Sequence, residues 1–123
     1  MIFTEVNTST FIKAFNEART ESQQVAKATS KPEDLDAYNS RFYLSVDHKS
    51  GFAVTLEGNL NAVFSLVKGR GDSLVSHAIN FGAYTLDCFD GYLPKFYSKH
   101  GFNEYRREAN WTAGEPDVVF MTL

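Results

Sequence analysis

The chain has 123 residues, of which 43% are hydrophobic and 15% aromatic, and its formal net charge is −3. This size and apolar content predict one packed domain over residues 1–123 and exclude an intrinsically disordered chain. The mild acidity argues against general binding to nucleic acid or anionic membranes, and one cysteine, Cys88, excludes an intramolecular disulfide.

The first third of the chain is predicted to hold a strand and two helices. Residues 1–6 are strand-like, and Thr8 or Ser9 can cap a helix that follows. Its apolar residues fall at helical spacing on one face: Phe11, Ala14, Phe15 and Ala18. The polar residues 20–28 could extend this helix.

A second start signal follows at residues 30–33, Ser-Lys-Pro-Glu. It has the form of a capping box with proline just inside the helix. We therefore expect a short helix that ends near Asn39.

The middle of the chain changes to an alternation of period two, starting at Arg41. Apolar residues alternate through three runs, separated by turns at residues 48–51 and 57–59. The last of these runs is residues 60–67. The pattern predicts three antiparallel strands in a meander.

The last part alternates helices and strands. A glycine-bearing turn leads into a helix whose inward face is predicted to be Leu74, Val75, Ala78, Ile79 and Gly82. A buried strand is expected at residues 85–89, then a helix at residues 92–100. Residues 102–111 and 117–123 are strand candidates separated by a loop that contains glycine and proline.

This order of elements defines the predicted fold class. A strand-helix-strand unit between the meander and the end of the chain requires a parallel pair inside a mostly antiparallel sheet. We therefore expect an α/β protein with a mixed sheet that is flanked by helices and has a central parallel pair.

The most informative segment is GYLPKFYSKHGFNEY, from Gly91 to Tyr105. Leu93, Phe96 and Tyr97 share one helical face, and Gly101 supplies the left-handed residue that commonly ends a helix. The run FYSKHGF resembles the closing segment of the GNAT superfamily of acyl-CoA-dependent N-acetyltransferases. The resemblance implies a GNAT-like fold in which the parallel strands splay apart, and it covers residues 42–123.

The resemblance also implies a reaction. In this superfamily an amine attacks the thioester carbonyl of acetyl-CoA, and a tyrosine beside the sulfur can give the departing thiolate a proton. The position of that tyrosine is Tyr97 in this chain. The implied function is transfer of an acetyl group from acetyl-CoA to a primary amine. The run FDGYLPKFYSKHGF, from Phe89 to Phe102, together with the strand at Pro116–Met121, also resembles acetyltransferases of phages and other mobile elements.

A second segment, Lys68-Gly69-Arg70-Gly71-Asp72-Ser73, joins a strand to a helix. Glycines let backbone amides approach a ligand closely, and a helix start adds positive potential. The segment resembles the Q/R-x-x-G-x-G/A motif that grips the pyrophosphate of coenzyme A, with Lys68 and Ser73 as substitutions. A carboxylate at Asp72 would repel a diphosphate unless it turned outward or capped the helix. Read from the residues alone, the segment could equally be an ordinary strand-helix turn.

The remaining cofactor contacts follow from the family. The pantetheine arm would lie between the splayed strands and bond to the backbone of residues 62–67. The family often has an asparagine seven positions before the tyrosine, where this chain has Asp90. The cofactor-binding set that the resemblance implies is Leu66, Val67, Lys68, Gly69, Arg70, Gly71, Asp72, Ser73, Asp90 and Phe96.

No general base is identified, because residues 60–67 contain no carboxylate. The other acidic candidates are more typical of solvated charges: Glu104, Glu108, Glu115 and Asp117. This leaves a second hypothesis, a catalytically inactive GNAT-like module that binds a protein partner with or without CoA. A third is an α/β fold unrelated to GNATs, in which the parallel pair would not splay.

Other kinds of site are not expected. The histidines do not pair at metal-ligand spacing, so we predict no metal, and Cys88 is typical of a buried inert thiol. No apolar run approaches the ~20 residues that cross a bilayer, and the N-terminus does not resemble a secretory signal. We therefore expect a cytoplasmic protein that binds acetyl-CoA and an amine acceptor, whose identity and whose oligomeric context the sequence does not reveal.

Overall fold

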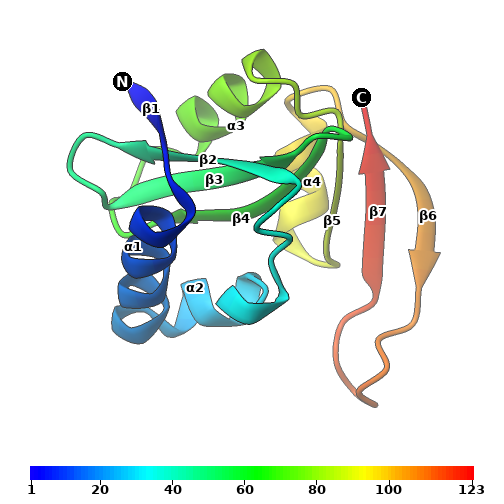
Figure 1. The fold of residues 1–123 in the computed structure, drawn as a ribbon. Helices are drawn as coiled ribbons and strands as arrows, with labels where there is room; N and C mark the ends of the chain where they lie inside the picture. The colour runs from blue at the N-terminus through cyan, green and yellow to red at the C-terminus, as the bar shows by residue number, and fades with distance from the viewer.

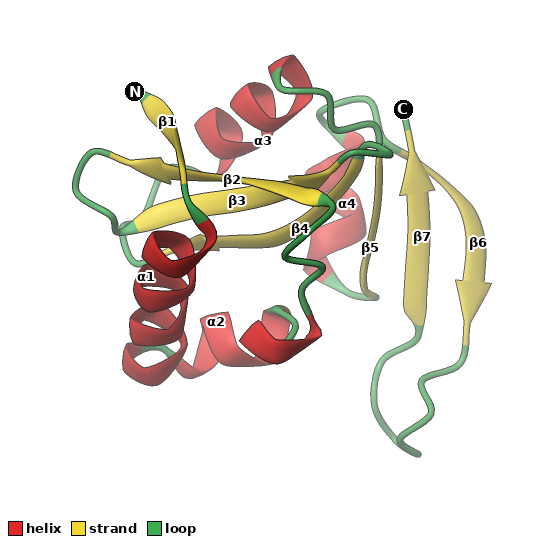
Figure 2. Ribbon diagram, viewed as in Figure 1, coloured by secondary structure: helices red, strands yellow, loops and turns green.

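The computed structural model describes all residues from Met1 to Leu123 and has an α/β architecture. Seven strands form one sheet in the order β1-β2-β3-β4-β5-β7-β6, and helices cover both of its faces (Figures 1 and 2). The elements along the chain are β1 Phe3–Val6, α1 Thr8–Glu21, α2 Gln23–Ala28, the 3₁₀ turn η1 Pro32–Asp34, β2 Ser40–Ser45, β3 Ser50–Thr55, β4 Asn59–Ser65, α3 Gly71–Asn80, β5 Thr85–Phe89, α4 Tyr92–Ser98, β6 Asn103–Glu108 and β7 Val118–Thr122.

The predicted order of strands and helices is confirmed, and so is the single parallel pair, which is β4 with β5. All other neighbouring strands are antiparallel. Because α3 connects β4 to β5 across one face, the two strands must run in the same direction. The coarse fold class that the sequence predicts is therefore correct.

The core lies in two layers, one on each face of the sheet. The larger layer packs between the sheet and α3 and α4, and it includes Phe52, Val75 and Phe102, which are fully buried. The second layer packs under α1 and includes Phe11, Phe15 and Phe42. Burying aromatic side chains of this size supplies much of the hydrophobic free energy of folding.

Strand β4 changes face partway along its length. Leu60 belongs to the core layer under α3, whereas Ala62 and Phe64 belong to the layer under α1. Regular alternation would place residues two apart on the same face. Ala62 has a positive φ of 52°, and the register with β3 shifts by one residue beside it. These are the marks of a β-bulge, which adds one residue and bends the strand.

Several details of the N-terminal half differ from the prediction. The cap of α1 is Asn7, whose side chain accepts a hydrogen bond from the Thr10 amide, not Thr8 or Ser9. The predicted single helix is interrupted at Ser22. The Ser22 hydroxyl accepts a hydrogen bond from the Val25 amide and caps α2 as a separate helix. The capping box predicted at residues 30–33 does not form, because Lys31 occupies the cap position with no side-chain bond.

The predicted helix up to Asn39 is therefore only one 3₁₀ turn.

Three further differences concern the strands and α3. β4 ends at Ser65 and β6 at Glu108, both earlier than the sequence suggests. Gly82 lies beyond the end of α3 and is exposed, so it does not belong to the inward face of that helix.

Candidate functional site

The contact between β4 and β5 is unusually short. The two strands are in register only at Asn59 with Thr85 and at Leu60 with Leu86. The bulge at Ala62 begins directly after this contact and turns β4 away from β5. Figure 1 shows the result: β2, β3 and β4 run across the view, whereas β5, β7 and β6 stand upright beside them.

A cavity of about 470 Å³ lies where the two strands separate. Its walls are residues 60–63 of β4 and residues 86–89 of β5, together with the inner face of α4. The segment from α2 to η1 closes one side, and Trp111 from the β6–β7 loop stands at the edge with 87% of its surface exposed. The cavity thus collects parts of the chain that are far apart in sequence.

Tyr97 is the residue of α4 that is buried against this cavity, with 7% of its surface exposed. Its hydroxyl makes no hydrogen bond to another protein group, and no fully enclosed polar side-chain atom lacks a partner, so the hydroxyl must reach the cavity space. Burial, with the nearby Cys88 and Asp87 as further causes, raises the pKa of Tyr97 above its ordinary value. The phenol therefore remains protonated at neutral pH.

Asp87 is a cavity residue that the sequence analysis did not identify. It lies on β5 between Leu86 and Cys88, which point into the core under α3, so its side chain points to the opposite face. No ion pair or side-chain hydrogen bond engages its carboxylate. Desolvation by the surrounding protein raises the pKa of Asp87. A lone carboxylate in an otherwise apolar strand was the signal that could have found it.

Cys88 is buried on the other face of β5, as predicted. Burial and the nearby carboxylates raise the pKa of its thiol to about 12. The thiol is therefore protonated at neutral pH and is not a nucleophile. No group of three or more metal-ligating side chains occurs in the structure.

The turn at residues 68–73 lies beside the cavity at the start of α3. No backbone N–H of these six residues donates a hydrogen bond within the protein. Gly69 has a φ of +85° and open space where a Cβ would stand. Gly71 has no such space, because a Cβ there would lie 3.1 Å from the Phe96 ring, which also lines the cavity. Phe96 therefore lies against the turn and also lines the cavity.

The charged residues of the turn point in different directions. Arg70 donates to the Asp47 carboxylate at 2.7 Å and to the Ser50 hydroxyl at 3.0 Å, which ties the turn to the β2–β3 hairpin. Asp72 pairs with the His100 imidazole at 2.9 Å, so its carboxylate faces the end of α4. Lys68 is exposed and Ser73 lies near His77. Of the two cations in the turn, Lys68 alone is outside an ion pair.

The other predicted contacts lie farther from the gap. The amide of Leu66 donates to the Lys49 carbonyl, and the amide of Val67 donates to the Ser65 hydroxyl. Asp90 binds Arg107 at 2.7 Å, which lowers the pKa of this carboxyl. Among the predicted cofactor-binding residues, only Phe96 lines the cavity, and the turn at residues 68–73 adjoins it through Gly71, which lies against Phe96.

The structure also places the acidic residues that were weighed as bases. Glu104 and Asp117 both lie near Arg107, at 2.9 and 3.6 Å, and belong to the same surface network as Asp90. Glu108 pairs with Arg106 at 3.2 Å, and Glu115 is exposed in the β6–β7 loop. None of these four residues lines the cavity, whereas Asp87 does.

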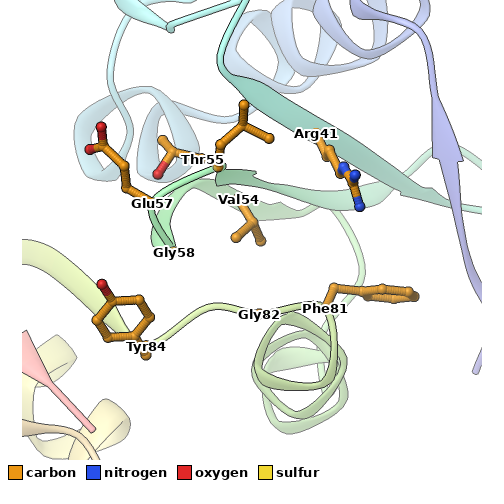
Figure 3. A pocket seen from close by; sticks show the side chains of 9 residues that line it. Arg41, Val54, Thr55, Glu57, Gly58, Phe81, Gly82 and Tyr84 are labelled. Atoms are coloured by element: carbon orange, nitrogen blue, oxygen red, sulfur yellow. The ribbon is translucent and has the colours of Figure 1, made fainter.

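A second hollow of about 570 Å³ lies between the β3–β4 turn and the end of α3. Figure 3 shows Arg41 and Phe81 at one side of it and Glu57 and Tyr84 at the other. Its charged side chains are exposed and stand on the open rim. It lies away from Tyr97 and the turn, so we take the cavity between β4 and β5 as the candidate site.

No helix has the combination of length and apolar character that would let it cross a membrane. Comparison with protein-family models and with curated protein sequences gave no match for this chain.

Proposed function

We propose that this chain is a GNAT-like N-acetyltransferase that moves an acetyl group from acetyl-CoA to a primary amine. The observation that carries the proposal is the cavity in the gap between β4 and β5, with the unpaired Tyr97 hydroxyl at its wall. A narrow gap between two separated strands suits an extended arm such as pantetheine, because unpaired strand backbone can bond to it as it would to a neighbouring strand.

The turn at residues 68–73 supports the binding of a diphosphate. Its six backbone N–H groups have no acceptor in the protein, and they lie at the positive end of α3. Lys68 adds a free cation. Arg70 would act indirectly, because its bonds to Asp47 hold the turn in place. The pairing of Asp72 with His100 accounts for an acidic residue at this position.

The side chains of the cavity fit an acyl transfer. Asp87 accepts a proton from the incoming ammonium, and the freed lone pair attacks the thioester carbonyl. As the N–C bond forms and the C–S bond breaks, the Tyr97 hydroxyl gives its proton to the departing sulfur. The second proton lost by nitrogen restores Tyr97, and Asp87 releases its proton to water. The net products are an amide, a thiol and one proton.

The raised pKa values are consistent with these roles. A carboxylate with a raised pKa is a stronger base than one in water, and a phenol with a raised pKa stays protonated until it is needed. The single free thiol, Cys88, suits a reducing compartment, and we therefore propose that the protein is cytoplasmic.

The test combines binding with turnover. Titration calorimetry with CoA and acetyl-CoA should detect binding, and a panel of primary amines added with acetyl-CoA should release free thiol. Binding with no thiol release for any amine would instead support the inactive module. If neither acetyl-CoA nor CoA binds, the proposal is refuted.

A further inference from the structure

The wall of the cavity opposite β5 carries an arginine that no carboxylate neutralises. Arg19, near the end of α1, lines the cavity and is half-buried. Its Nε donates to the Thr29 hydroxyl at 3.3 Å and one Nη2 hydrogen donates to the Ala26 carbonyl at 3.2 Å. Both acceptors are uncharged, and the Nη1 group has no acceptor in the protein. Part of this guanidinium is therefore available to a ligand.

The charges on the two walls have opposite signs. On the α1–η1 wall, the exposed Lys31 and Asp34 contribute one charge of each sign, so Arg19 leaves this wall with a net positive charge. On the β5 wall, Asp87 is the unpaired anion. A ligand that fills the cavity thus meets a positive group on one side and a negative group on the other.

We propose that the acetyl acceptor is a small amino acid or a similar compound, in which the amine faces Asp87 and a carboxylate is bound by Arg19. This inference rests on the proposed function and names the class of acceptor. A guanidinium with free N–H groups matches a carboxylate, because both are planar and can form two parallel hydrogen bonds.

Other acceptor classes fit less well. A polyamine would place a second cation against Arg19. An amine that carries no carboxylate would leave the guanidinium without a charged partner. The cavity volume of about 470 Å³ is also shared with the acyl arm of the cofactor, which leaves room for a small molecule. Acetylation would leave the carboxylate unchanged and would remove the charge of the amine.

The position of Trp111 allows a binding test that needs no acetyl-CoA. It is the single tryptophan of the chain and it stands at the cavity, so its fluorescence reports what enters. The probes share the 3-methylbutyl group and differ in which polar groups they carry: leucine, leucinamide, 3-methylbutylamine and 4-methylpentanoate. Leucine should bind most tightly, with a dissociation constant about tenfold or more below that of each probe that lacks the carboxylate or the amine, since one charge-assisted hydrogen bond contributes about that much.

Two variants show whether Arg19 is responsible. In Arg19→Gln, affinity for leucine should fall to the level of leucinamide, whereas affinity for leucinamide should not change. Arg19→Lys should recover part of the preference. Because Arg19 also holds Thr29 and Ala26, a purely structural role would weaken both probes equally. Lys13→Gln is the matched control, since it removes one charge from the exposed side of the same helix and should alter neither affinity.

Equal affinity of the wild-type protein for leucine and leucinamide, or tighter binding of 3-methylbutylamine, would overturn the inference. Loss of binding of both leucine and leucinamide in Arg19→Gln would also overturn it. The proposed function fails separately, when calorimetry shows no binding of CoA or acetyl-CoA. A protein that binds leucine through Arg19 but no CoA would retain this site and lose the transferase reaction.

Discussion

The two neighbours of β4 contact it in very different ways. On one side β3 pairs with it from Ser50 to Val54, and the aromatic core packs against both strands. On the other side β5 meets it in only two registered positions, at Asn59 and Leu60, and the strands then diverge. One strand therefore serves as part of the scaffold along one edge and as the wall of a cavity along the other.

The difference shows how a small domain can keep a cavity without losing its core. The bulge at Ala62 moves the next residues of β4 to the layer under α1, so they continue to pack there while the edge toward β5 opens. Stability is therefore expected to depend on the β1–β4 side, and activity on the β4–β5 side. Each of the following changes tests that division.

The largest effect on stability is expected for Phe52→Ala in β3. Phe52 is fully buried and its ring lies 5.5 Å from that of Phe3 and 5.1 Å from that of Tyr43. Loss of this side chain should lower the free energy of unfolding by about 3–5 kcal/mol, measured by urea denaturation. The control is Phe89→Ala in β5, where 36% of the residue is exposed and the loss should be much smaller. Equal losses would contradict the division.

Tyr97→Phe should affect turnover and little else. Removal of the hydroxyl takes away a proton donor that is bonded to no other protein group, so the rate of thiol release should fall by about a hundredfold. Affinity for CoA and the melting temperature should remain close to wild type, as measured by calorimetry and thermal melts. Unchanged turnover would remove Tyr97 from the mechanism.

Asp87→Asn should lower turnover by about a hundredfold and raise the melting temperature at pH 7. The pKa of Asp87 is raised in the folded protein, so its ionised form is disfavoured there and costs stability at neutral pH. That cost disappears as the pH falls through the raised folded value toward the ordinary value of 3.8, where wild type and variant should converge.

Thermal melts from pH 7 to pH 3 measure this difference. Asp90→Asn is the control with the opposite sign, because the ion pair with Arg107 lowers the pKa of Asp90. A melting temperature of Asp87→Asn below that of wild type at pH 7 would show that the carboxylate has a stabilising partner.

Gly71→Val should weaken CoA binding by about tenfold, or ~1.4 kcal/mol. The sequence predicts that a glycine here lets the backbone amides approach a phosphate closely. The structure gives a different neighbour, because the new Cβ would stand 3.1 Å from Phe96 and push that ring toward the cavity. Gly82→Ala is the control: it strains the backbone, at a φ of +103°, but its new Cβ meets no atom within 4 Å. If both variants bind CoA equally well, the turn has no role in binding.

The smallest effect is expected for Asp47→Asn, which removes the ion pair that anchors Arg70. Hydrogen bonds from Arg70 hold the pKa of Asp47 well below its ordinary value of 3.8, so the pair stabilises the fold above that pH. Both side chains are partly exposed, and the melting temperature should fall by only a few degrees at pH 7. The difference from wild type should shrink as the pH falls below 3.8. A difference that persists unchanged at lower pH would point to another cause.

The sequence alone determined the order of the elements and the buried face of α1. Alternation placed β2 and β3, helical spacing placed α1, and Gly101, with a φ of 95°, ends the α4 region as predicted. These features follow from interactions within a few residues, which a local pattern records. Where two local signals competed, as at the Asn7 cap and the Ser22 break, the sequence did not decide between them.

Only the tertiary structure decided how the site is built. Residues Arg19, Asp87 and Trp111 come from a helix, a strand and a loop, and no spacing in the sequence indicates that they share one cavity. The bulge at Ala62 contains no glycine that would have indicated it in the sequence. Arg70 pairs with Asp47, which lies 23 residues away in the chain. Such contacts depend on strand register and on charge pairs between distant segments, which form only when the whole sheet has assembled.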